Sequence, residues 1–196
     1  MTASSTPARL RPTTLSDLEA LPQCGPTCPV PRPFAEQEWA VETQAQLGWC
    51  GVRLRQADRT TGYALVNVAD SPVRRSSVDP EVSAAAVTAL WVARDCRGQG
   101  MGRQLVQGLA AAATRSGLQV LLAVGSRGPG SCAAPPVGWW QRQGFRVATD
   151  HPIHPVLRLD LDRTVRWAWW SEWWDRVRHS IGGWEAPPHP TSRSGA

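Results

Sequence analysis

The sequence contains no lysine, because all 21 of its basic residues are arginine. This absence runs through the whole chain, so it indicates the codon bias of a GC-rich genome better than it indicates a local function. The net charge is +5 and the sequence pI is about 9.5. A nucleic-acid-binding protein needs its basic residues clustered, and here they are scattered. We therefore expect no nucleic-acid partner, although an anionic ligand would also need some basic surroundings.

Long apolar runs are also missing. No run approaches the roughly 18 residues that span a bilayer, and the polar start, Met1 to Pro7, lacks the apolar core of a secretion signal. These absences predict a cytoplasmic protein that does not bind membranes. A length of 196 residues with 42% hydrophobic content can bury one sizeable core, and nothing in it demands two domains.

Cysteine is present in an odd number, five, which in a cytoplasmic chain favours reduced thiols over a disulfide framework. Cys24 and Cys28 lie four residues apart in a turn rich in proline and glycine. They could chelate zinc with Cys50, Cys132 or a histidine, but no second paired motif exists in the sequence. Thiols in a loop beside a substrate are the favoured interpretation, and we expect no metal site.

A glycine-rich turn, Arg97-Gly98-Gln99-Gly100-Met101-Gly102, organises the chain. The apolar run 86–92 before it predicts a buried strand. The segment 102–116 after it predicts a helix with one apolar stripe, formed by Leu105, Leu109, Ala112 and Ala113. Glycines allow positive φ and close approach, and the first turn of a helix leaves amide N–H groups without internal partners. Such a turn favours a bound phosphate.

Neither common nucleotide fingerprint fits this turn. The Lys-Ser/Thr pair of the P-loop is absent, and the third glycine of GxGxxG, counted from Gly98, would fall on Arg103. Arg97-x-x-Gly100-x-Gly102 instead resembles the [Q/R]-x-x-G-x-[G/A] signature of the GNAT superfamily of acyl-CoA-dependent N-acetyltransferases. In that family the amides of this loop hold the pyrophosphate of coenzyme A.

Later segments extend the resemblance to roughly residues 86–160. Gly138–Phe145 looks like the helix-to-strand segment of the family, and it follows a second apolar run at 120–124. The segments 145–147 and 156–159 look like its last two strands. The resemblance implies an α/β fold with a mixed sheet, here a GNAT-like domain at 8–163. We expect the ends, 1–7 and 185–196, to be disordered.

The resemblance implies transfer of an acetyl group from acetyl-CoA to an amine of a small molecule or a protein. The alternative is a coenzyme A-binding regulatory or interaction module with little or no catalytic activity. The cofactor-binding residues implied are Leu90, Trp91, Val92, Arg97, Gly98, Gln99, Gly100, Met101, Gly102, Arg103 and Trp140.

The catalytic residues are harder to assign. Trp140 stands where the family has a tyrosine that acts as the general acid. An indole N–H can donate a hydrogen bond but cannot release a proton at neutral pH. The sole tyrosine, Tyr63, is interpreted as a packing residue. Glu81 is the first candidate for the general base, followed by Asp79, His151 and His154.

Other segments have simpler interpretations. Prolines make 22–33 irregular, and a helix is expected at 34–47. Residues 51–56 and 62–68 are expected to form a hairpin, and 70–83 a polar surface loop. In that loop, the pair Arg74-Arg75 is either solvated or in contact with the 3′-phosphate of the cofactor. The further expectations are a first strand at 9–11, a short helix capped by Thr14 or Ser16, and a mobile loop at 125–136 near the acceptor amine.

Tryptophan recurs at helical spacing near the end of the chain. Segment 164–184 is predicted to be a helix with a stripe that includes Trp167, Trp170 and Trp174, ended by Gly182-Gly183. Tryptophan buries a large area, so the stripe should cover something. Packing on its own domain is slightly favoured over a homodimer seam, and a cofactor or lipid site is third.

Overall fold

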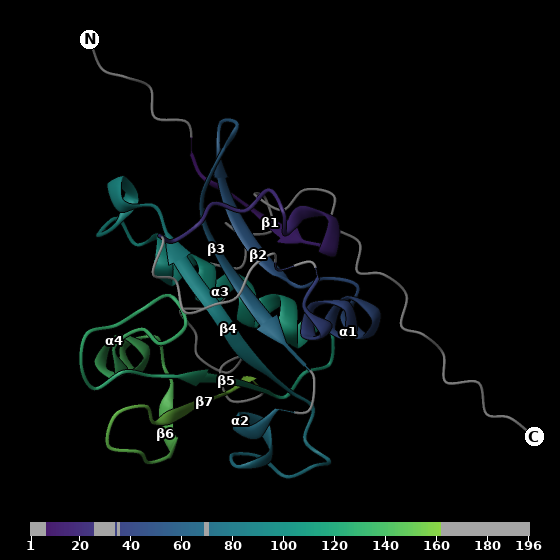
Figure 1. Ribbon diagram of the computed structural model, residues 1–196, viewed down its shortest axis with the longest axis vertical. Coiled ribbons are helices and arrows are strands. Elements are labelled where there is room, and N and C mark those ends of the chain that lie inside the picture. Colours follow the sequence, from purple (N-terminus) through teal and green to yellow (C-terminus); the bar gives the residue numbers. More distant parts are fainter. Residues whose placement is uncertain (1–6, 26–33, 35, 69–70, 162–196) are drawn as a thin grey trace, which may run out of the picture.

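The computed structural model describes residues 7–25, 34, 36–68 and 71–161. One mixed sheet runs through this part of the chain in the order β1-β2-β3-β4-β5-β7-β6 (Figure 1). The strands are β1 Arg9–Thr13, β2 Gly51–Gln56, β3 Arg59–Asn67, β4 Ala84–Val92, β5 Val120–Val124, β6 Arg146–Thr149 and β7 Val156–Asp160. The β4–β5 pair is parallel and the other neighbours are antiparallel. The mixed α/β fold expected from the sequence is confirmed.

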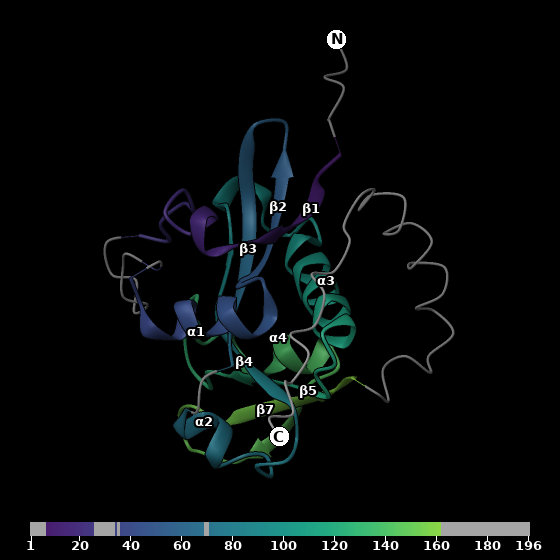
Figure 2. The same cartoon turned by 90° about the vertical axis from the view of Figure 1, so that its right-hand side faces the viewer.

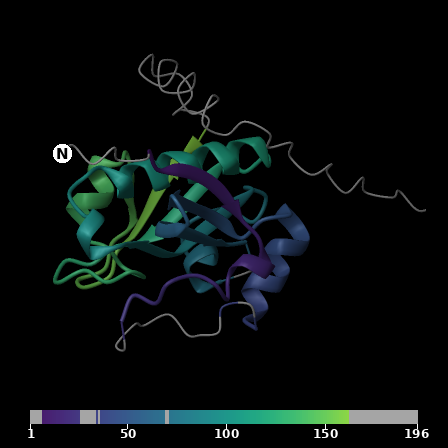
Figure 3. The same cartoon turned by 90° about the horizontal axis from the view of Figure 1, so that it is seen from above.

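Helices cover both faces of the sheet. Helix α3, Met101–Arg115, packs on one face, and α1, Glu38–Leu47, on the other (Figures 2 and 3). The remaining helices are α2 Pro72–Arg75, α4 Val137–Arg142 and the 3-10 turns η1 Leu15–Asp17 and η2 Arg94–Cys96. Alternate strand residues face opposite ways, so Ala64 and Val66 join the core under α3 while Tyr63 and Leu65 join the core under α1.

Strands β4 and β5 run side by side over only part of their length. Ala84–Val87 pairs with Val120–Ala123, while the rest of β4, residues 88–92, continues along β3. The register between β3 and β4 shifts at this point, because Val66 pairs with Val87 and Leu65 with Ala89, which leaves Thr88 as an extra residue. Such a bulge bends a strand. The second half of β4 therefore presents a backbone edge at the centre of the sheet.

The hairpin turns more tightly than the sequence predicts. Strand β3 begins at Arg59, so Ala57 and Asp58 alone form the turn, and Ala57 takes a positive φ of 52°. The register shifts between Leu54, which pairs with Gly62, and Arg55, which pairs with Thr60, so that Thr61 is an extra residue in β3. The helix expected at 34–47 begins only at Glu38.

The expected polar loop at 70–83 is also more structured than predicted. It contains α2, and its valines at 73, 78 and 82 pack on a small core formed by residues of β4, β5 and β7. Arg74 donates hydrogen bonds to the carbonyl oxygens of Val68, Val82 and Ala84 at 3.0–3.4 Å. Arg74 therefore ties the end of β3 to the start of β4, in place of either role expected for it.

Some expectations fall outside the described residues: the Trp-rich helix at 164–184, the tail 185–196, nearly all of 1–7, and Cys28. Within the described ranges, no helix has both the length and the apolar character that a bilayer crossing requires. The same ranges hold no group of three or more His, Cys, Asp or Glu side chains placed for a metal ion.

Candidate functional site

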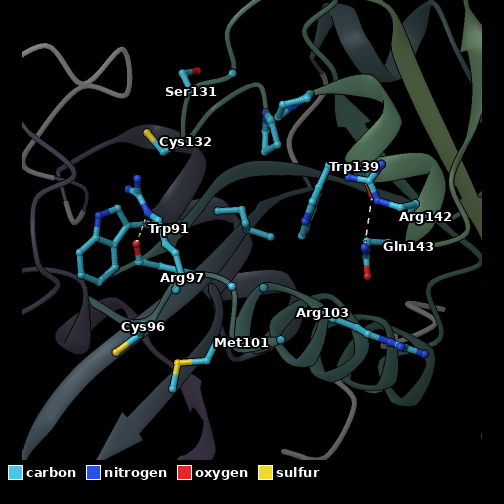
Figure 4. Close-up of a pocket in the computed structure, with 18 of the residues that line it drawn as sticks. Trp91, Cys96, Arg97, Met101, Arg103, Ser131, Cys132, Trp139, Arg142 and Gln143 are labelled. Carbon is cyan, nitrogen blue, oxygen red and sulfur yellow. Dashed lines mark hydrogen bonds between the residues drawn. The ribbon is translucent and has the colours of Figure 1, made fainter. Parts of the chain in front are cut away.

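A cavity of about 940 Å³ opens at the carboxyl end of β4. Its walls come from β4, the glycine-rich turn, the start of α3, the loop 125–136 and α4, which lies across the cavity from α3 (Figure 4). Nine of the eleven cofactor-binding residues expected from the sequence line it: Leu90, Trp91, Val92, Arg97, Gly98, Gly100, Met101, Gly102 and Arg103. Gln99 and Trp140 are the two that do not.

The three glycines of the turn serve different physical needs. Gly98 and Gly100 have φ of +76° and +78°, a left-handed backbone conformation that residues with a side chain rarely adopt. Gly100 precedes the first turn of α3 and accepts a hydrogen bond from the N–H of Gln104. Gly102 has no positive φ, but a Cβ there would lie 2.9 Å from ring carbon Cζ2 of Trp139. The turn thus presents the first amides of α3 to the cavity without obstruction.

The cavity has a positive lining. Arg97, Arg103 and Arg142 line it, and among the described residues that line it there is no aspartate or glutamate. Arg97 donates from Nε to the carbonyl oxygen of Val92 at 3.1 Å, which holds it at the end of β4 (Figure 4). Gln99 is turned to Asp95, whose carbonyl oxygen accepts its side-chain N–H at 2.9 Å. A ligand with several negative charges suits this lining.

Asp95, the carboxylate nearest in sequence to the turn, is engaged elsewhere. Arg59 donates to it at 2.6 and 2.8 Å in a paired arrangement on the surface. Hydrogen bonding from Arg59 is the main reason that the pKa of Asp95 lies below its ordinary value. Asp95 stays ionised but is neutralised by its partner, so it does little to repel an anion at the turn.

The loop 125–136 covers the edge of β4. The N–H of Leu90 donates to the carbonyl oxygen of Cys132 at 2.7 Å. The sulfur of Cys132 lies 3.2 Å from the sulfur of Cys24, in the segment after η1. The ends of the loop are joined, since Ser126 donates to the carbonyl of Pro135 and accepts from the N–H of Val137. The loop predicted to be mobile thus has defined backbone hydrogen bonds in this structure.

A second cavity, of about 410 Å³, lies on the other side of this loop. Ser131 lines both cavities, so the loop forms a wall between them. The smaller cavity is lined by Asn67, Ser71, Val73, Ala86, Val87, Thr88, Val124, Ser131, Ala133, Ala134 and His154. This described lining is mainly apolar, and no Arg, Asp or Glu is among these residues. It can hold a small molecule with apolar groups.

The candidate bases are not gathered in one place. All four are exposed, and Glu81, Asp79 and His151 line neither cavity. His151 accepts the N–H groups of Ile153 and His154 on its Nδ1. His154 is the one candidate that lines the smaller cavity, and its Nδ1 lies 3.3 Å from the carbonyl oxygen of Gly125.

Trp140 belongs to the core. It is 1% exposed, its Nε1 donates to the carbonyl oxygen of Val124 at 3.2 Å, and it packs against Phe145. Its neighbour Trp139 lines the larger cavity instead. Tyr63 is fully buried, as a packing residue would be, and stacks on Trp91 with ring centroids 5.4 Å apart.

Sequence reasoning missed Trp139, Arg142 and Gln143 as lining residues. A signal for them existed, because residues three and four apart share one face of a helix. Positions 139, 142 and 143 have that spacing, and position 140 lies off it. Which of the two tryptophans faces the ligand depends on the angle at which α4 meets the sheet, and the motif alone does not contain that angle.

Comparison with solved structures finds the same fold in proteins of low sequence identity. The GNAT family N-acetyltransferase YhbS from Escherichia coli, solved in complex with CoA, has a TM-score of 0.52 at 19% identity, with 83% of this chain and 87% of that chain covered. For yncA from Salmonella typhimurium, solved with its cofactor acetyl-CoA, the TM-score is 0.54 at 17% identity, with coverage of 80% and 95%. The GNAT-like decarboxylase GphF, in complex with isobutyryl-CoA, has a TM-score of 0.56 at 20% identity, with coverage of 78% and 99%.

No match was found among curated proteins. The family model described as the acetyltransferase (GNAT) family matches residues 15–145, which is more than half of the chain. That range includes β4, the glycine-rich turn, α3 and α4, so it contains most of the elements that build the larger cavity. The chain therefore belongs to the GNAT acetyltransferase family.

Proposed function

We propose that this protein is an N-acetyltransferase that transfers an acetyl group from acetyl-CoA to an amine. The observation that carries the proposal is the turn at the start of α3. Gly98 and Gly100 are left-handed, Gly102 leaves room for Trp139, and three arginines line the cavity beside them, with no carboxylate among its described lining residues. This arrangement fits the pyrophosphate of coenzyme A.

The first amides of α3 would hold the pyrophosphate, with Arg97, Arg103 and Arg142 supplying positive charge. When bound, acetyl-CoA supplies the acetyl group as a reactive thioester. Leu90 lies in the part of β4 that does not pair with β5, and its N–H is bonded to the carbonyl oxygen of Cys132. Once that carbonyl moves away, the N–H of Leu90 can donate to the carbonyl oxygen of the thioester.

An amine attacks only as the neutral base, so the site needs a group that accepts a proton. His154 is proposed for this role in preference to Glu81, because it alone among the candidate bases lines a cavity next to the loop. If Nδ1 donates its proton to the carbonyl of Gly125, Nε2 remains as the acceptor. The apolar lining of the smaller cavity favours a small amine with apolar groups.

A coenzyme A-binding regulatory module is the second candidate. Two observations favour it. The N–H of Trp140 is bonded to Val124, so this residue offers no acid to a leaving thiolate, and the carbonyl of Cys132 occupies the N–H of Leu90. Against it, holding two reactants in the right geometry supplies much of the rate in acyl transfer without a strong acid.

Two measurements test the proposal. Calorimetry should detect binding of acetyl-CoA, and its absence would remove both candidate functions. Release of free thiol from acetyl-CoA, measured with a panel of small amines and of peptides with a free N-terminal amine, separates the two candidate functions. Amine-dependent release above the rate without protein supports the enzyme. Binding without release from any amine supports the regulatory module. A cytoplasmic location and a homodimer remain predictions.

A further inference from the structure

Two cysteines from distant parts of the chain meet at the wall of the larger cavity. Cys24 follows η1, Cys132 lies in the loop 125–136, and the two are 108 residues apart in sequence with their sulfur atoms 3.2 Å apart. Both side chains are partly exposed and both line the cavity. Solvent and small solutes therefore reach the pair.

The backbone on each side of the pair is anchored to the sheet. The carbonyl oxygen of Cys132 accepts the N–H of Leu90 on β4 at 2.7 Å. The carbonyl oxygen of Pro22, two residues before Cys24, accepts the hydroxyl of Tyr63 on β3 at 3.2 Å. Tyr63 stacks on Trp91, the neighbour of Leu90. Adjacent strands thus hold the two thiols facing each other, which lowers the entropy lost when they are linked.

We infer that Cys24 and Cys132 are a dithiol that forms a reversible disulfide by exchange with a low-molecular-weight disulfide, and that this bond locks the loop 125–136 on the edge of β4. A disulfide needs the sulfur atoms at about 2.05 Å, so they must approach by roughly 1 Å, a distance that side-chain rotation can supply.

The exchange balances in two steps. The thiolate of one cysteine attacks a sulfur of the small disulfide, which forms a mixed disulfide and releases one small thiolate. The thiolate of the other cysteine then attacks the protein sulfur of that mixed disulfide, forms the Cys24–Cys132 bond and releases the second small thiolate. The two protons of the cysteines end on the two released thiols. The small disulfide is reduced and the protein is oxidised by two electrons.

The bond would act on the cavity through the loop. With Cys132 linked to Cys24, its carbonyl stays on the N–H of Leu90, and the wall between the two cavities stays closed. The oxidised protein should therefore release thiol from acetyl-CoA in the presence of an amine at least tenfold more slowly than the reduced protein. This last consequence rests on the proposed function, whereas formation of the bond does not.

Glutathione disulfide mixed with glutathione at a series of ratios is the probe. Thiols are trapped with N-ethylmaleimide after acid quenching, and linked peptides are located by tandem mass spectrometry. Wild type and Cys28→Ser should both form the Cys24–Cys132 link, and Cys132→Ser should not. Closing a loop of this length should raise Tm by about 5–15 °C in the two proteins that form the link.

Cys50 is the internal control, because it is fully buried and burial raises the pKa of its thiol to about 11. It should form no glutathione adduct and no disulfide at any ratio, so N-ethylmaleimide should find it as a free thiol after quenching. The inference would be overturned if the protein formed glutathione adducts but no internal disulfide, if it formed a Cys24–Cys28 link, or if it formed no link at any ratio. The same would follow from a linked protein that releases thiol in the presence of an amine as fast as the reduced one. If reduced protein binds no acetyl-CoA, the proposed function fails while the mass and Tm measurements still decide on the disulfide.

Discussion

The ring of Trp139 lies over Gly102, so close that a Cβ on this glycine would be 2.9 Å from ring carbon Cζ2. Helix α4 and the start of α3 thus meet through a glycine and a tryptophan at the rim of the larger cavity. Gly102 therefore cannot gain a side chain unless Trp139 shifts or is replaced by a smaller residue.

Gly102→Ala should therefore push Trp139 aside and lower the affinity for acetyl-CoA about tenfold. Trp139→Phe has a smaller ring and should leave room for the added methyl group. In a double-mutant cycle the two changes should be coupled by about 0.5–3 kcal/mol, because residues in contact are not additive. Calorimetry on the four proteins provides the measurement, and additive effects would show that the contact is unimportant for binding.

Gly100 can be compared with Gly117, because φ is +78° at one and +76° at the other and both have open space around the missing Cβ. Alanine at either position should destabilise the fold by about 1–2 kcal/mol through the same backbone strain. Only Gly100 lines the cavity. We expect Gly100→Ala to lose acetyl-CoA affinity and Gly117→Ala to keep it, as measured by calorimetry beside thermal melts. Equal affinity in the two variants would argue against binding at the turn.

Trp140→Phe should affect stability more than chemistry. It removes the hydrogen bond from Nε1 to the carbonyl of Val124 and some buried ring area, which should lower the free energy of unfolding by about 1–3 kcal/mol. Loss of a catalytic acid would lower turnover roughly 10²- to 10⁴-fold. Turnover at saturating acetyl-CoA, with a thermal melt beside it, should change by less than about tenfold. A thousandfold loss in folded protein would mean that Trp140 has a catalytic role.

His154→Gln and Glu81→Gln decide between the two candidate bases. His154 lines the smaller cavity, whereas Glu81 is exposed outside both cavities. His154→Gln should lower turnover roughly 10²- to 10⁴-fold with a smaller effect on acetyl-CoA binding. Glu81→Gln should leave turnover unchanged. The reverse pattern would return the role to Glu81.

Asp17 should make the fold sensitive to acid. Burial raises the pKa of Asp17, but hydrogen bonds from the backbone of Thr14 and from Arg53 outweigh it, so the pKa lies below its ordinary value of 3.8. Because the folded-state pKa is the lower one, the stability that the ion pair with Arg53 contributes is present above about pH 4. It is lost as the pH falls through the folded-state pKa.

Chemical denaturation from pH 7 to pH 2 tests this prediction. Asp17→Asn should lower the free energy of unfolding by about 1 kcal/mol at pH 7, and the difference from wild type should shrink toward low pH. Asp58→Asn is the control, because Asp58 is fully exposed and 3.8 Å from Arg55. An unchanged difference across the whole range would contradict the assignment.

Local order could be predicted where neighbours in sequence decide it. The strand before the turn, the left-handed glycines and the helix after them depend on hydrophobic periodicity and on φ values that only glycine adopts freely. The family followed from the same residues. Boundaries such as the start of β3 at Arg59 were less predictable, because a bulge shared between two strands sets them.

The sequence alone determined that a strand, a glycine-rich turn and a helix stand in that order and offer amides to an anion. Only the tertiary structure decided which side chains meet there. It placed Trp139 rather than Trp140 at the cavity, His154 rather than Glu81 beside the loop, and Cys24 against Cys132. Contacts between segments this far apart depend on how helices and loops pack on the sheet, and spacing along the chain does not encode that packing directly.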